Sequence, residues 1–216
     1  MRFPEPPPPE HLDPLIATWP ADRPFFRVHP RRYAPDQFNA SGAGQARFSP
    51  LVVDGRIVPT LYGADSLEGA LSESVFRFVP AGDQELRARR VFTASLTDLM
   101  VSQVAVRRDL TLMDLRGFGL GGARIPITRV ALIESNATHY PDTRRWSETF
   151  YRHPRTVDGL IWVSRQYDQA QCFVVFGDRV GAELYSTAPS QALLEGKMFI
   201  ELLRIAQLAK IDLILP

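Results

Sequence analysis

The sequence predicts one domain of the mixed α+β class. The 216 residues fit a single domain, and a hydrophobic content of 45% is enough for a substantial core. Most of the apolar segments are short and rich in β-branched and aromatic residues, whereas helical spacing occurs in only a few places. The short strands do not alternate regularly with helices, so a doubly wound parallel sheet is not expected.

The N-terminal segment is predicted to be an arm outside this domain. Residues 4–9 are rich in proline, which favours an extended and exposed polyproline II conformation. We therefore assign residues 1–22 to a proline-rich N-terminal arm and residues 23–216 to the domain, including its C-terminal helix. The domain begins with a short strand at residues 25–28, and residues 29–44 are rich in turn-forming residues.

The next segment is predicted to be a strand followed by a helix. Residues 58–62 are β-rich and contain a proline, which is typical of an edge strand. Apolar residues near helical spacing then predict a helix over about residues 66–78. Asp65 or Ser66 serves as its N-cap, and the proline and glycine within residues 80–82 end it.

The remaining elements follow from the same patterns. Strands are expected at residues 89–96, 110–115, 157–163, 172–176 and 182–186, a flexible loop at residues 117–122, and helices at residues 127–136 and from Ser190 to Lys210. The last helix is amphipathic, so its apolar face either extends the core or forms a surface for a partner.

The charge balance argues against several functional classes. Lys and Arg total 25 against 24 Asp and Glu, which gives a formal net charge of +1. A basic excess that follows a nucleic-acid backbone is missing, so direct nucleic-acid binding is not expected. No segment approaches the roughly 18–20 consecutive apolar residues of a membrane span, and the N-terminus lacks the apolar stretch of a signal peptide. We therefore expect a cytoplasmic protein that does not associate with a membrane.

Metal, disulfide and phosphate-loop motifs are not predicted. Cys172 is the only cysteine, which excludes an intrachain disulfide and a cysteine-cluster metal site, and its apolar neighbours predict a buried side chain. The histidines are never four residues apart and have no carboxylate cluster beside them, so a dedicated metal site is not expected. Residues 117–122 are rich in glycine but lack the strand–loop–helix context and the lysine of a phosphate-binding loop. The sequence contains no GxSxG motif, which would indicate the nucleophile of a catalytic triad.

Four polar side chains are candidates for chemistry at a dinucleotide. Arg27 lies in the first strand of the domain and Arg47 in a glycine-flanked loop, where function often concentrates. Tyr62 ends a strand, and Glu73 lies beside the apolar positions of the predicted helix, where a carboxylate costs free energy unless it is paired. Each residue also has a structural explanation, because packed aromatic rings and structural ion pairs are common.

Four stretches of the sequence carry a family resemblance: FFRVHP, GQARFSP, TLYGADSLEGALSE and VDGLIWVSRQYDQAQCFVVFG. Together they resemble the RES domain, the toxin of the RES–Xre bacterial toxin–antitoxin systems, over about residues 24–180. The sequence departs from the family pattern at Ser49, where asparagine is usual, and in the stretch VVDGRIVPTL, which is longer than expected.

The resemblance implies an ADP-ribosyltransferase-like fold, with mixed or antiparallel sheets and flanking helices, that degrades NAD by cleaving the nicotinamide–ribose bond. It implies that Glu73 accepts a hydrogen bond from a ribose hydroxyl and stabilises an oxocarbenium-like transition state. Tyr62 would stack on the nicotinamide ring, and Arg47 and Arg27 would hold the pyrophosphate through bidentate hydrogen bonds. Ser164 would donate a hydrogen bond to Glu73 or to the ribose. NAD is then a substrate, and no prosthetic group is expected.

Several alternatives remain open at this point. The acceptor of the ADP-ribosyl group is water, inorganic phosphate as a co-substrate, or a macromolecule, and these correspond to a glycohydrolase, a phosphorylase and an ADP-ribosyltransferase. The chain could instead be a catalytically silent binding module of the same fold. The family also implies an Xre-type antitoxin that restrains the toxin by covering the cleft between Arg47 and Glu73. A homo-oligomer or a higher toxin–antitoxin assembly is compatible with the sequence.

Overall fold

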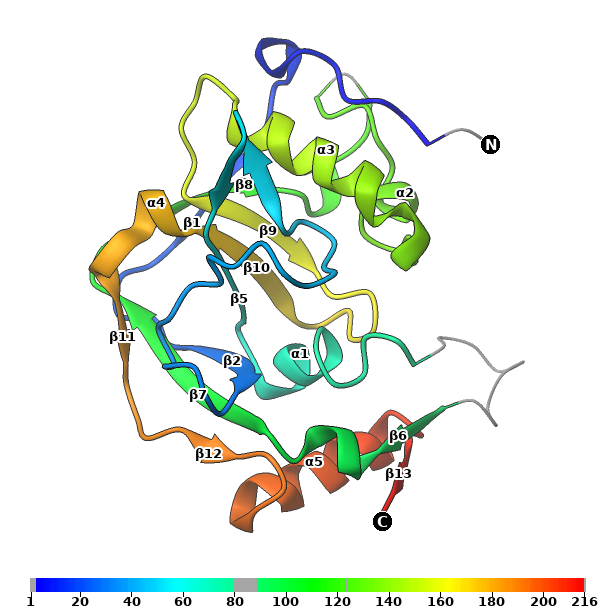
Figure 1. The fold of residues 1–216 in the computed structure, drawn as a ribbon. Coiled ribbons are helices and arrows are strands. Elements are labelled where there is room, and N and C mark those ends of the chain that lie inside the picture. The colour runs from blue at the N-terminus through cyan, green and yellow to red at the C-terminus, as the bar shows by residue number, and fades with distance from the viewer. Residues whose placement is uncertain (1–2, 80–88, 123, 216) are drawn as a thin grey trace.

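One curled nine-stranded sheet forms the framework of the molecule (Figure 1). The structure is a computed structural model that describes residues 3–79, 89–122 and 124–215. The strands lie in the order β1-β8-β9-β10-β5-β2-β7-β11, and β12 also pairs with β7. Within this sheet only β8 and β9 are parallel neighbours. The prediction of a mixed α+β domain is therefore confirmed.

The strands of this sheet are β1 (Ile16–Trp19), β2 (Phe25–Pro30), β5 (Thr60–Ala64), β7 (Leu99–Val106), β8 (Leu110–Asp114), β9 (Gly159–Val163), β10 (Gln171–Phe176), β11 (Leu184–Ser186) and β12 (Gln191–Ala192). Two small sheets accompany it: a hairpin of β3 (Leu51–Val53) and β4 (Arg56–Val58), and a parallel pair of β6 (Arg90–Phe92) and β13 (Asp212–Ile214). The helices are α1 (Leu67–Ser72), α2 (Arg129–Leu132), α3 (Tyr140–Tyr151), α4 (Gly177–Val180) and α5 (Gly196–Leu208). Short 3₁₀ turns occur at η1 (Pro9–His11), η3 (Thr93–Leu96), η4 (Gly117–Gly119), η5 (Ala137–His139) and η6 (Gly181–Glu183).

The sheet is weakly joined between β2 and β5. Strand β2 pairs with β7 along six residues, but it registers with β5 only through Phe26 and Ala64. Gly63 of β5 explains the close approach at this point, because a Cβ atom there would lie 2.5 Å from Cδ2 of Phe25 and 2.7 Å from Cζ of Phe173. The two halves of the sheet consequently diverge from a single point of contact.

The core consists of three clusters, and the two longest helices cover opposite ends of the sheet (Figure 1). Trp146 and Phe150 of α3 are fully buried in the first cluster, which also contains Trp162 of β9. Helix α5 contributes Leu202 and Ile205 to the third cluster. The apolar face of the C-terminal helix therefore extends the core, although other apolar residues of α5 remain exposed. Cys172 is buried, as its neighbours predicted.

The N-terminal residues differ from the predicted arm. Residues 16–19 form β1, which pairs with β8 from Ile16↔Met113 to Trp19↔Leu110, and Trp19 is buried. The proline-rich part lies along α3, where the Trp146 indole donates a 2.9 Å hydrogen bond to the Pro4 carbonyl. The strand was missed because its partner lies far away in the sequence.

Several predicted elements have different bounds in the structure. The N-cap of α1 is Ser66, whose Oγ accepts from the Gly69 amide, but the helix ends at Ser72 and not near residue 78. The predicted stop within residues 80–82 lies outside the described residues. Strand β7 was not predicted at all, and only the first half of the strand expected at residues 89–96 forms, as β6.

The other two predicted helices are also shorter. The helix expected at residues 127–136 is the single turn of α2. The C-terminal helix begins at Gly196 and has no Ser190 cap, because Gln191 and Ala192 pair with β7 first.

Candidate active site

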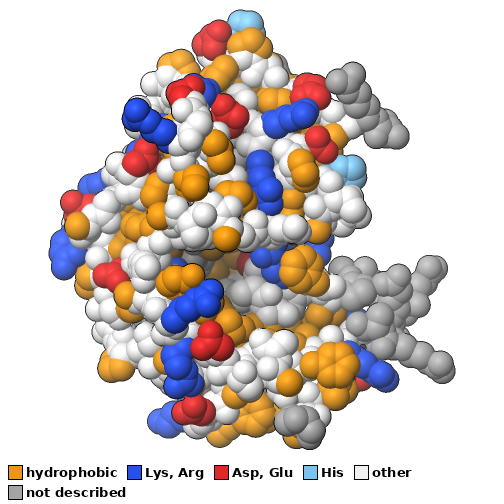
Figure 2. Space-filling view, viewed as in Figure 1, with side chains coloured by type: hydrophobic (Ala, Val, Ile, Leu, Met, Phe, Trp, Pro, Cys, Tyr) orange, Lys and Arg blue, Asp and Glu red, His pale blue; other side chains and the backbone are white. Residues whose placement is uncertain are grey.

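A cleft opens where β2 and β5 diverge, and its lining contains most of the predicted site residues. It has a volume of about 400 Å³ and is lined by residues of β2, β5, α1, β9 and the loops that follow, including Arg47, Tyr62 and Glu73. The space-filling view shows a hollow across the middle of this face (Figure 2). The divergence of the sheet therefore positions the cleft.

Glu73 and Ser164 are in direct contact. Glu73 is the C-cap residue that follows α1, and the Ser164 hydroxyl after β9 donates a 2.7 Å hydrogen bond to its Oε1. Ser164 is completely buried, and its Oγ accepts from the Gln166 amide at 3.2 Å. The carboxylate is thus held by a neutral hydroxyl in a fixed orientation, and it forms no ion pair with a described residue.

Tyr62 connects the cleft to the Arg47 loop. Its hydroxyl accepts a 3.1 Å hydrogen bond from the Phe48 amide. Its ring packs edge-on against Trp162 at a centroid distance of 6.1 Å. Burial raises the pKa of the Tyr62 hydroxyl, so the residue remains a neutral phenol. Tyr62 therefore holds the loop in place while its ring lines the cleft.

Arg47 is buried and is largely held by backbone groups. Its Nη1 donates to the Leu132 carbonyl at 3.0 Å, and to the carbonyl and hydroxyl of Ser135 at 3.2 and 2.9 Å. Burial lowers the pKa of Arg47, and the charge of Glu73 partly offsets that effect. One end of the guanidinium is consequently committed to the segment after α2, a role that the sequence did not predict.

Arg27 lies next to this site and not at its centre. Its Nη1 donates a 2.6 Å hydrogen bond to the Pro35 carbonyl, and burial lowers the pKa of its guanidinium to about 10. A small recess of about 40 Å³ is lined by both Arg27 and Glu73, together with Cys172. Burial raises the pKa of Cys172 well above its ordinary value, so this thiol stays protonated.

Sequence reasoning missed two arginines of the cleft, Arg77 and Arg165. The Arg77 guanidinium donates to the Gln45 carbonyl at 2.8 Å and to the Tyr140 hydroxyl at 3.3 Å. Arg165 donates to the Arg77 carbonyl at 2.6 Å. A signal for both was present in the sequence, because Arg77 is four positions after Glu73 within the predicted helix and Arg165 directly follows Ser164.

The cleft continues into a second lobe of about 510 Å³. Both lobes are lined by Tyr62, Arg77 and His29, so these residues lie at their junction. The second lobe adds Arg27, Arg32 and other residues between β2 and the Arg47 loop. The site as a whole is elongated and has two compartments, with the carboxylate in one of them.

Trp162 contributes an unpaired donor at the first lobe. Its Nε1 atom is buried and has no hydrogen-bond acceptor among the described residues. An unpaired buried donor costs free energy, and such groups call for an explanation such as binding. Trp162 also lines the recess shared by Arg27 and Glu73.

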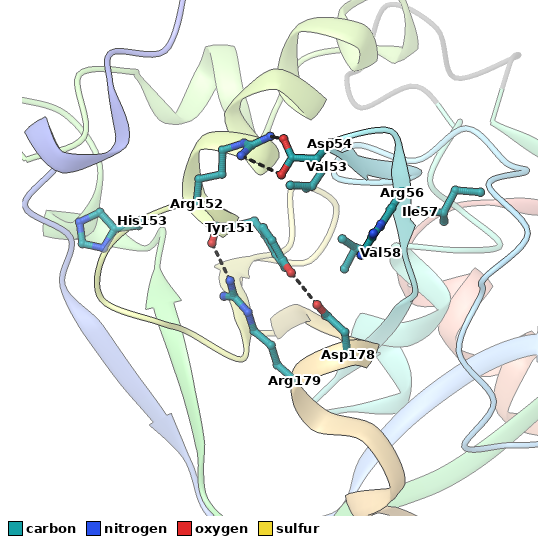
Figure 3. A pocket seen from close by; sticks show the side chains of 10 residues that line it. All are labelled: Val53, Asp54, Arg56, Ile57, Val58, Tyr151, Arg152, His153, Asp178 and Arg179. Atoms are coloured by element: carbon teal, nitrogen blue, oxygen red, sulfur yellow. Dashed lines mark hydrogen bonds and ion pairs between the residues drawn. The ribbon is translucent and has the colours of Figure 1, made fainter.

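A cavity larger than the first lobe lies elsewhere, around the β3–β4 hairpin (Figure 3). Its volume is about 860 Å³, and none of the predicted site residues line it. The charges there are mostly satisfied internally: Arg152 pairs with Asp54 at 2.6 Å, and the Tyr151 hydroxyl donates to Asp178 at 2.5 Å. The candidate site is the cleft that Glu73 lines, because the carboxylate there is held by the Ser164 hydroxyl.

Neither a metal-binding cluster nor a membrane-spanning helix occurs among the described residues. No group of three or more His, Cys, Asp or Glu side chains there has an arrangement that could hold a metal ion. None of the helices in this part of the chain is both long and apolar enough to cross a membrane.

Comparisons with known proteins agree with the resemblance seen in the sequence. A protein-family model, described as the RES domain, matches residues 24–193. One similar solved structure is the crystal structure of the M. tuberculosis MbcT–MbcA toxin–antitoxin complex, with a TM-score of 0.51 and 14% sequence identity. The alignment covers 82% of this chain and 85% of that chain, and at this identity it supports the fold. No curated protein matches the sequence. The family model spans most of the chain, and the chain therefore belongs to the RES domain family.

Proposed function

We propose that this protein is the toxin of a toxin–antitoxin pair and that it cleaves the nicotinamide–ribose bond of NAD. The observation that carries this proposal is the Glu73–Ser164 pair, in which a single carboxylate is fixed by a hydroxyl in a cleft otherwise rich in arginine. NAD matches this arrangement: its pyrophosphate suits the arginines, and the positive charge that develops on its ribosyl C1′ in the transition state suits the carboxylate.

The proposed chemistry requires few groups. The C1′–N bond breaks, its electron pair remains on the nicotinamide nitrogen, and the cationic ring leaves as a neutral molecule. A strong general acid is therefore unnecessary, unlike the case of ordinary glycosidases. Glu73 accepts a hydrogen bond from a ribose hydroxyl and stabilises the positive charge that develops on the ribose, and Ser164 keeps its rotamer fixed. An acceptor hydroxyl then adds to C1′ and loses its proton.

The other cleft residues have supporting roles in this proposal. The Tyr62 ring orients the nicotinamide, and its hydroxyl fixes the loop that carries Arg47. The remaining donors of Arg47, together with Arg27 and Arg77, hold the pyrophosphate through charge-assisted hydrogen bonds. Removing the substrate from water strengthens each of these interactions.

An antitoxin is the partner that we propose. Loss of NAD arrests growth, so a cell that carries this enzyme needs a protein that restrains it. The similar solved structure is described as a toxin–antitoxin complex, which supports an antitoxin for this chain as well. We propose an Xre-type protein that covers the two-lobed cleft.

The test is to incubate purified protein with NAD and to follow free nicotinamide, with and without inorganic phosphate. Release that needs phosphate indicates a phosphorylase, and release in its absence indicates a glycohydrolase. Labelling of added protein or nucleic acid by the ADP-ribosyl group would indicate a transferase. The proposal is wrong if no nicotinamide forms under any of these conditions with folded protein.

A further inference from the structure

The two lobes of the cleft contain more positive charge than NAD can neutralise. Their described lining residues include one carboxylate, Glu73, and five arginines: Arg27, Arg32, Arg47, Arg77 and Arg165. The pyrophosphate of NAD supplies two negative charges, and its nicotinamide ring carries one positive charge. The excess positive charge indicates a ligand with at least one further phosphate.

Arg32 is the arginine that is free to bind this phosphate. The other four donate hydrogen bonds to backbone carbonyl groups near the cleft. Arg32 is exposed and has no hydrogen bond or ion pair among the described residues; its guanidinium lies 5.0 Å from the centroid of the Tyr33 ring. A guanidinium that is not committed to the fold can bind a ligand phosphate without breaking an existing contact.

The second lobe also lacks the group that usually selects NAD over NADP. In Rossmann-type sites, a carboxylate against the ribose 2′-hydroxyl selects NAD and a nearby arginine accommodates the 2′-phosphate of NADP; the same charge argument applies to this lobe. No Asp or Glu is among the described residues that line the second lobe or the adjoining 320 Å³ pocket. Tyr33 lines both spaces and offers an aromatic surface against which a base can pack.

We propose that the second lobe binds a 2′-phosphorylated adenosine and that the protein cleaves NADP at least as efficiently as NAD. Arg32 contacts the 2′-phosphate, while Arg27 and Arg77 remain with the pyrophosphate. The reaction is the one proposed above, so this inference rests on the proposed function. The C1′–N bond breaks, nicotinamide leaves with the electron pair, and the acceptor hydroxyl adds to C1′ and loses a proton. With water, the products are nicotinamide, 2′-phospho-ADP-ribose and a proton.

The experiment compares nicotinamide release from NADP and from NAD by the wild type, Arg32→Ala and Arg31→Ala. Arg31 is a matched control, because it is the adjacent arginine but pairs with Glu195 at 3.3 Å and does not line the cleft. We expect Arg32→Ala to lower kcat/KM about tenfold for NADP and about twofold for NAD, since the lost contact is a charge-assisted hydrogen bond. Arg31→Ala should leave both values within the error of the measurement.

A binding measurement separates this inference from the proposed function. Titration calorimetry of NAD and NADP with Glu73→Gln needs no turnover, and Glu73→Gln/Arg32→Ala is its counterpart. If NADP binds more tightly than NAD and the double variant loses that preference, the 2′-phosphate site stands even when nicotinamide release fails. If the two dinucleotides bind equally, if neither binds, or if NAD alone is cleaved, the inference is overturned. An equal loss in Arg31→Ala would overturn the assignment to Arg32.

Discussion

The cleft beside Glu73 and the cavity beside the β3–β4 hairpin contain similar side chains but pair them differently. In the hairpin cavity, Arg152 pairs with Asp54 and with the nearby Glu148, whereas Arg179 donates to backbone carbonyl groups. In the cleft, the carboxylate of Glu73 is held by a hydroxyl, and the arginines are held by backbone carbonyl groups. The first lobe of the cleft has less than half the volume of the hairpin cavity, yet its described lining contains three arginines and one carboxylate. The candidate site is therefore chosen on its charge pattern and not on its size.

The largest effect is expected for Glu73→Gln, which keeps the shape of the side chain and removes its charge. Nicotinamide release from NAD should fall by on the order of a hundredfold to a thousandfold, since electrostatic stabilisation of the transition state is a large contribution. Glu68→Gln is the matched control, because Glu68 lies on the same helix but pairs with Arg204 at 2.7 Å. Equal activity of the two variants would refute the role of Glu73.

Ser164→Ala should have a smaller effect, mainly on kcat. The variant removes the hydroxyl that orients the carboxylate, and hydrogen bonds to charged groups contribute about 1.5–3 kcal/mol, equivalent to roughly a tenfold to hundredfold change. Steady-state kinetics with a thermal unfolding curve separates lost orientation from lost stability. Thr149→Ala, which removes a buried hydroxyl on α3 outside the cleft, should keep its activity. A Ser164→Ala enzyme with unchanged kcat would exclude the orienting role.

Ionic strength should distinguish the cleft from the hairpin cavity. Because the arginines of the cleft are not paired with carboxylates, salt should screen their attraction for the dinucleotide and raise KM about threefold between 0.05 and 0.5 M sodium chloride. Activity measured at constant pH in both salts provides the value, with sucrose as an uncharged control. A KM that is independent of salt would contradict the charge imbalance that we describe.

The smallest effect is expected for Arg152→Ala in the hairpin cavity. Its ion pairs are exposed, and exposed pairs contribute little to stability. Nicotinamide release should stay within about twofold of the wild type, because a surface substitution away from the site has a small effect. A strong loss of activity with unchanged folding would show that the larger cavity takes part in function, and the comparison above would have to be reversed.

The sequence predicted well those elements that are locally distinctive. The apolar runs of β9 and β10, the N-cap at Ser66 and the buried Cys172 are visible in short windows, because burial on both faces selects continuous apolar residues. Strand β7 was missed because Ser102 and Gln103 interrupt its apolar pattern, although it lies beside β2 in the sheet. Strand β1 was missed because its partner is remote in the sequence.

The candidate site residues were predictable only from the order of the family motifs along the chain. Glu73 and Ser164 are 91 positions apart, and no periodicity predicts that their side chains meet. The resemblance brought them together as expected functional residues, but it did not indicate the internal role of Arg47, which binds the segment after α2. Arg32 and Arg77 depend on how the loops fold over the cleft, and this cannot be inferred from a single sequence.

The single registered pair between β2 and β5 has a mechanical consequence. Residues from both halves of the sheet line the cleft, with Val28 and His29 on the β2 side and Tyr62 on the β5 side. A bound dinucleotide would therefore contact both sides of the β2–β5 junction, where the two backbones register at one residue pair. The amides of β2 and β5 beside this junction should exchange their hydrogens more slowly when the dinucleotide is bound. The amides of the β2–β7 ladder should change little. Hydrogen exchange at the β2–β5 junction therefore reports whether a dinucleotide occupies the cleft, and it does not depend on catalysis.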